Sequence, residues 1–92
     1  MRQDVSGAKH FREALAATPQ EIRQQMEWSF HIANQIDDAL KANGMTQKEL
    51  AERIGTSAAA VSRWLSGGHN FTLSTLAKIS AVLGVPLISV AK

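Results

Sequence analysis

The chain has 92 residues, 45% hydrophobic and 20% charged, which fits one compact domain and excludes an intrinsically disordered segment. It has no cysteine, and its three histidines, His10, His31 and His69, lie far apart, so we expect no disulfide, no metal ion and no other cofactor. The net charge of +2 is too small by itself to identify a partner.

The charges are distributed unevenly along the chain. All eight acidic residues lie at or before Glu52, where they outnumber six lysines and arginines, whereas residues 53–92 carry four basic residues and no acidic one. This arrangement indicates an anionic partner for the basic half, unless the clustering arose by chance among so few charges.

The N-terminal residues are polar and charged through Glu13, with no apolar run behind them. No apolar stretch approaches the ~18 residues that a membrane span requires. We therefore expect no signal peptide, no membrane contact and a soluble, cytoplasmic protein.

Two helices are predicted in the first half of the chain. A short one over Ala8–Ala17 places Phe11 and Leu15 on one side. The sequence TPQE, starting at Thr18, then supplies a threonine N-cap, a proline at the first helical position and a glutamate at the third. These residues form a capping box, which predicts the start of a longer helix.

The longer helix is apolar on more than one side and ends at Asn43-Gly44, where glycine can take the left-handed conformation. Its main stripe consists of Ile22, Met26, Phe30, Ala33, Ile36 and Leu40, and a second set consists of Trp28, Ile32 and Ala39. Both sides must be buried, either against its own domain and a partner, or twice within one monomer.

Two short helices follow. Thr46 and Glu49 form a second capping box, which opens a helix that ends at Gly55. The next helix covers residues 58–65, with Ser57 as a cap and Gly67-Gly68 as a break after it. Its inner side is expected to carry Val61, Trp64 and Leu65.

The last clear helix begins after Thr72 and ends at Gly84. Its buried face is expected to contain Leu73, Leu76, Ile79, Val82 and Leu83. The segment Leu87–Val90 follows Pro86 and is rich in β-branched residues, so it predicts either an edge strand or an extended tail.

The two short helices are separated by about three turn residues, which is the spacing of a helix-turn-helix unit at about residues 46–65. Ala51 is small enough for a close approach of the helices, Gly55 can take a positive φ, and Val61 fills the angle between them. The run TQKELAERIGTSAAAVSRWLSGG and its continuation NFTLSTLAKISAVLGV resemble the Xre and lambda-repressor-like family over roughly residues 32–85.

The resemblance implies an all-α, lambda-repressor-like bundle of the five-helix type. Residues 1–31 would form an N-terminal helical extension and residues 32–92 the DNA-binding domain, with a short C-terminal strand if Leu87–Val90 pairs. It also implies a transcriptional regulator that binds double-stranded operator DNA as a homodimer, with the helix over residues 58–65 in the major groove.

If Val61, Trp64 and Leu65 face inward, helical spacing turns four residues outward as candidate base readers, namely Ala58, Ala59, Ser62 and Arg63. Arg63 can bond both O6 and N7 of a guanine, worth about 1–3 kcal/mol of discrimination, or it can contact a phosphate. Ser62 reads a base edge or is a solvated surface serine. The alanines offer only methyl contacts, where many relatives carry longer polar side chains, so shape readout would contribute more.

Backbone phosphates are expected to bind at helix N-termini and turns. The first candidate is Gln47, and the weaker ones are Thr46, Lys48, Ser57, His69 and Asn70. Gln47 matches a family position at which glutamine bonds a phosphate. Thr46 and Ser57 are equally well explained as caps, and Asn70 as a loop residue. Trp64 and Phe71 are interpreted as core rather than as base-stacking platforms.

A second hypothesis is an antitoxin similar to those of the Xre type, which binds its own operator and a protein toxin. Its toxin-facing surface would be the first 30 residues, with Phe11, Trp28 and Phe30. An enzyme is not expected, because the chain has no nucleophile and base pair, no metal-ligand spacing and no glycine-rich phosphate loop.

Overall fold

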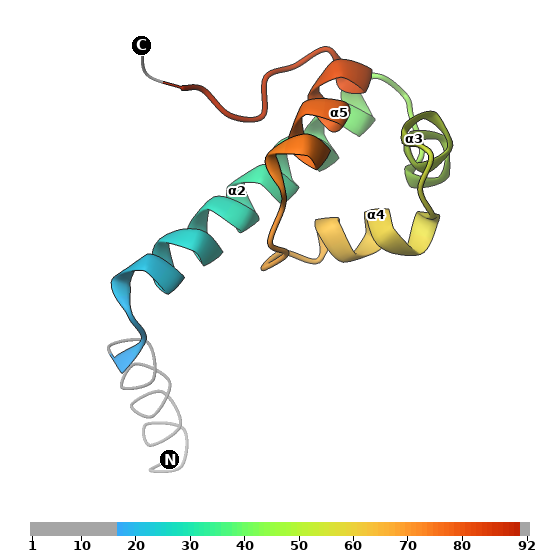
Figure 1. Cartoon of the computed structure of the whole chain (residues 1–92). Coiled ribbons are helices and arrows are strands. Elements are labelled where there is room, and N and C mark those ends of the chain that lie inside the picture. The colour runs from blue at the N-terminus through green and yellow to red at the C-terminus, as the bar shows by residue number, and fades with distance from the viewer. Residues whose placement is uncertain (1–16, 91–92) are drawn as a thin grey trace, which may run out of the picture.

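The computed structural model describes residues 17–90, and their regular elements are all helical (Figure 1). Helix α2 spans Gln20–Ala42, α3 spans Gln47–Ile54, α4 spans Ala58–Leu65 and α5 spans Leu73–Leu83. This confirms the all-α prediction. The helix predicted over Ala8–Ala17, in the N-terminal extension, lies outside the described residues except for its last residue.

Helix α2 begins one residue later than its capping box predicts. Pro19 occupies the N-cap position with a φ of −54° and a ψ of 144°, and its carbonyl accepts the amides of Ile22 and Arg23. The helix therefore starts at Gln20, and the predicted assignment of Thr18 as N-cap is wrong. A proline can hold this position because its fixed φ suits the entry to a helix.

Two backbone bonds close the end of α2 as predicted. Gly44 has a φ of +60°, its amide donates to the Lys41 carbonyl, and the amide of Met45 donates to the Leu40 carbonyl. This pair of bonds is the Schellman motif, in which a left-handed residue lets the chain satisfy the last free carbonyls. The chain then turns sharply into α3.

The second half of α2 packs on α4 and α5, and α3 packs on both of the same helices. The most deeply buried side chains are Ile36, Leu50, Val61 and Ile79, one from each helix. The core therefore lies where the four helices meet. Burial of one such side chain contributes about 1.5–3 kcal/mol.

The C-terminal segment after α5 carries no strand, so the edge-strand alternative for Leu87–Val90 is wrong and the extended alternative holds. Leu87 is buried in the core, and its amide donates to Ser80 Oγ at 3.2 Å. The hydrogen bond to Ser80 and the buried side chain of Leu87 thus hold this segment against α5.

The first half of α2 projects beyond the group formed by α3, α4 and α5 (Figure 1). The residues that α2 buries all lie between Ser29 and Leu40, whereas Ile22, Met26 and Phe30 from the predicted apolar stripe remain exposed. Among residues 17–90, no helix is long and apolar enough to cross a membrane.

Candidate nucleic-acid interface

Helices α3 and α4 form the predicted helix-turn-helix unit. Ala51 is buried against the core, and Val61 is fully buried. Gly55 closes α3 in the left-handed conformation with a φ of +86°, and the amides of Gly55 and Thr56 both donate to the Ala51 carbonyl. The turn therefore depends on a residue without a Cβ, because other residues adopt this φ at a cost.

Helix α4 has one buried and one exposed side. Ala60, Val61 and Trp64 are buried, and Leu65 is partly buried against the core. The four predicted base readers, Ala58, Ala59, Ser62 and Arg63, are all exposed. The core thus fixes the helix from behind and leaves a face with small side chains and one guanidinium free. The burial of Ala60 was not predicted, because the small side chain of alanine contributes little to an apolar pattern.

The N-terminus of α3 is closed by the predicted capping box. The amide of Glu49 donates to Thr46 Oγ1, and the amide of Thr46 donates to Glu49 Oε1, both at 3.1 Å. Because the carboxylate accepts this backbone bond, the pKa of Glu49 is lowered from its ordinary value. Gln47 and Lys48 are exposed in the first turn, where free amides suit an anion.

Ser57 caps α4, because its Oγ accepts the amide of Ala60 at 3.1 Å. Thr46 and Ser57 therefore have structural roles as caps, which was one of the two interpretations left open for them. The hydroxyl hydrogen of a capping serine or threonine is still available to donate to an oxygen of a partner.

The loop after α4 is held by an aromatic cluster. Trp64 is 6% exposed, and its ring centroid lies 6.2 Å from that of Phe71. The ring of His69 meets that of Phe71 edge-on, with centroids 4.8 Å apart. Trp64 and Phe71 therefore belong to the core side of the domain, as predicted, and His69 is partly enclosed by them.

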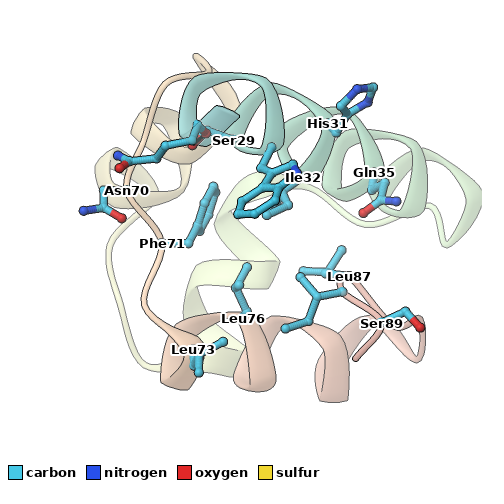
Figure 2. A pocket seen from close by; sticks show the side chains of 13 residues that line it. Ser29, His31, Ile32, Gln35, Asn70, Phe71, Leu73, Leu76, Leu87 and Ser89 are labelled. Atoms are coloured by element: carbon cyan, nitrogen blue, oxygen red, sulfur yellow. Dashed lines mark hydrogen bonds between the residues drawn. The ribbon is translucent and has the colours of Figure 1, made fainter. Parts of the chain in front are cut away.

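Asn70 is exposed but lines a groove rather than the helix-turn-helix unit. The groove has a volume of about 550 Å³. Figure 2 shows residues of α2 along one wall and Leu73 and Leu76 of α5 along the other, with Leu87 beside them. Leu73 is 72% exposed, so its predicted burial is wrong. No pattern in the sequence predicts this groove.

Within residues 17–90, no three acidic or histidine side chains are placed to hold a metal ion. Arg63 is the one charged side chain of α4, and residues 53–90 contain no carboxylate to compete for it.

A family model described as helix-turn-helix matches residues 36–89, which is more than half of the chain. The match begins within the second half of α2 and includes all of α3, α4 and α5. No curated protein matches the chain. The projecting half of α2 lies outside the matched residues.

Proposed function

This chain belongs to the helix-turn-helix family of Xre and lambda-repressor-like DNA-binding regulators, and on that basis we propose that it reads operator DNA as a homodimer. In this proposal α4 enters the major groove, and the N-terminal turn of α3 contacts the sugar-phosphate backbone. The observation that carries the proposal is the exposed side of α4, held in place by the buried Val61 and Trp64.

Each exposed residue of α4 has a defined chemical role. Arg63 provides two parallel donors for the O6 and N7 atoms of a guanine. Ser62 donates or accepts at a neighbouring base edge, and Ala58 and Ala59 contact thymine methyl groups. Because the alanines are short, the helix can approach the base edges closely, and the sequence-dependent shape of the duplex contributes to recognition.

Gln47, Lys48 and Ser57 are assigned to the phosphates on either side of the groove. All three are exposed at the starts of α3 and α4, where the amides of the first turn and the helix dipole favour an anion. These contacts fix the register of α4 on the duplex without reading sequence. Asn70 is left outside this set because it lines the groove beside α2.

The test begins with selection of a duplex from a random library by the full chain, followed by anisotropy titration with the selected and a scrambled duplex. Arg63→Ala is expected to weaken binding to the selected duplex about tenfold or more and to relax preference at one base pair per half-site. Arg23→Ala, which removes the same charge from an exposed position on α2, is the matched control and should leave that preference intact.

The salt dependence separates the two roles of Arg63. A base contact leaves the slope of affinity against salt nearly unchanged when Arg63 is removed, whereas a phosphate contact lowers the slope by about one per contact. Equal and weak binding of the wild type to selected and scrambled duplexes would rule out sequence-specific reading.

A second candidate function is that of an antitoxin, favoured by the groove of about 550 Å³ and by Trp28, which lines it and is 61% exposed. An exposed aromatic side chain beside a groove is typical of protein–protein interfaces. The purified chain would be mixed with the purified products of adjacent genes. Binding of operator DNA together with failure to bind any of these proteins would exclude this candidate.

A further inference from the structure

Exposed apolar side chains gather on one part of the molecule. Eight large apolar residues are exposed within the described part of the chain. Val85 lines a second, smaller pocket against the C-terminal half of α2, and Phe30 lies two residues from Trp28, on the other side of α2. The other six are Ile22, Met26, Trp28, Leu73, Ile88 and Val90. They lie on the projecting half of α2, along the groove beside it, or directly after its lining residues.

The projecting half of α2 continues the face that its second half buries. Gln25, Trp28 and Ile32 line the groove and so share one side of the helix. Ile22 lies three residues before Gln25, which places it on the same side. Farther along α2, residues on this side, such as Ile36, are buried in the core. The apolar face therefore extends beyond the domain that covers it.

The exposed area matches what a stable interface requires. A fully exposed aromatic side chain offers roughly 150–250 Å², and large aliphatic side chains lie near the lower end of that range. At exposed fractions between 40% and 74%, the six residues leave on the order of 600 Å² of apolar surface per copy. A standard interface takes ~800 Å² from each partner, of which roughly 56–65% is apolar. One partner of ordinary size can cover this surface.

We propose that the occupant is a second copy of this chain, with the projecting halves of the two α2 helices paired antiparallel about a two-fold axis near Gln25. This deepens the proposed function, because it assigns a surface to the homodimer. In such a pair, Gln25 of each copy faces its counterpart, with Ile22 on one side of it and Trp28 on the other.

The surface is self-complementary, as an interface with two-fold symmetry requires. A two-fold interface uses the same patch on both copies, so that patch must contain both the projecting part and the part that receives it. Here Ile22 and Met26 lie on one side of Gln25 along α2, and the groove bounded by Trp28, Leu73 and Ile88 lies on the other. The same apolar patch is therefore offered by each copy to the other.

The absence of cysteine from the chain makes the axis directly testable. A residue at a two-fold axis faces its own counterpart, so Gln25→Cys is expected to form a covalent dimer on mild oxidation. Glu27→Cys is the matched control, because it is exposed and lies two residues away on the opposite side of the helix. Its oxidation to a dimer should be at least about tenfold slower, because the two sulfurs would be too far apart to bond.

A second pair of variants measures association without DNA, by sedimentation equilibrium of the full chain. Ile22→Glu places a charge in the interface and is expected to raise the dimer dissociation constant at least about tenfold. Gln20→Glu adds the same charge in the same helical turn, away from this face, and should leave the constant unchanged. Circular dichroism checks that each variant keeps its helices.

A wild-type chain that sediments as a monomer, or equal crosslinking of Gln25→Cys and Glu27→Cys, would overturn this interface. The DNA titration is read separately. If dimers form as described but no duplex is preferred, the proposed DNA reading fails while the interface stands. If a dimer prefers one duplex but Gln25→Cys does not crosslink faster than Glu27→Cys, the proposed interface fails while the DNA reading stands.

Discussion

Gly67 joins two parts of the protein at a single residue. It follows α4, has a φ of +86°, and a Cβ at this position would overlap the ring of Phe30 from α2. Glycine is therefore required for two reasons, the left-handed backbone and the close approach of an aromatic ring. Gly68 also has a positive φ, of +73°, but a Cβ there would meet nothing within 4 Å.

Comparing Gly67 with Gly68 separates the cost of the left-handed backbone from the cost of the close approach of the Phe30 ring. Gly68→Ala is expected to lower the free energy of unfolding by about 1 kcal/mol, the cost of a left-handed alanine. Gly67→Ala is expected to cost more than Gly68→Ala because the Phe30 ring must also move, and the excess should stay below about 1 kcal/mol because that ring is half exposed. Urea denaturation measures both values. In a Phe30→Ala background the extra cost should disappear, and equal costs for the two glycines in the wild-type background would contradict this account.

The capping box of α3 makes the start of that helix sensitive to acid. Glu49 accepts the backbone amide of Thr46 at 3.1 Å, and this bond lowers the pKa of its carboxyl. A carboxyl with a lowered pKa in the folded state stabilises the fold above its ordinary pKa. That contribution is lost as the pH falls through the lowered value, because the unfolded chain takes up the proton first.

We expect an NMR titration of the Glu49 side chain to have its midpoint below the ordinary glutamate value, with the Thr46 amide shifting in parallel. Glu49→Gln keeps an oxygen acceptor but cannot titrate, so its stability should fall less steeply in acid than that of the wild type. Glu52→Gln removes the same charge from the same helix and serves as the control. A Thr46 amide that is insensitive to pH would contradict the bond.

At the scale of elements, local signals predicted most of the helix boundaries. The capping box at Thr46 and the glycines after α2, α3 and α5 act within four residues of the chain, and all lie where the sequence predicts them. Spacing also predicted the buried side of α4. It failed at the ends of two other helices, because Leu73 at the start of α5 and the apolar residues of the first half of α2 were expected to be buried and are exposed. Periodicity does not indicate where neighbouring elements end.

The groove could not be predicted from the sequence for a related reason. Its walls come from α2, from the loop and first turn of α5, and from the residues around Leu87, which are far apart along the chain. Only packing of the whole domain brings them together. By contrast, the exposed face of α4 was predictable, since it requires only the spacing of Val61 and Trp64 within one helix.

At the scale of the whole molecule, α2 connects the proposed dimer surface with the DNA-reading unit. Ser29 Oγ lies 2.7 Å from the carbonyl oxygen of His69, in the loop that follows α4, and Phe30 covers Gly67 in the same loop. Ser29 is 4% exposed, so this bond is shielded from water. The position of the projecting half of α2 is thereby fixed relative to the end of α4.

The distribution of charge over the molecule predicts a shallow salt dependence of DNA binding. Few cations are placed at the proposed interface, with Lys48 at the start of α3 and Arg63 on α4, while the amides of the helix N-termini contribute contacts that carry no counterion. For a dimer, Lys48 alone accounts for a slope of about −2 in the logarithm of affinity against the logarithm of salt, and both residues together for about −4.

Anisotropy titrations over a salt series would measure this slope. Lys48→Ala is expected to make it shallower by about two per dimer, because each copy loses one phosphate contact. Lys41→Ala is the control, since Lys41 lies on α2 with its Nζ 2.9 Å from Asp37 Oδ2, outside α3 and α4. A wild-type slope steeper than about −6 would mean that further cations, such as Arg53 or Lys78, reach the duplex, and the footprint of the protein on DNA would then extend well beyond the N-terminal turn of α3 and the exposed face of α4.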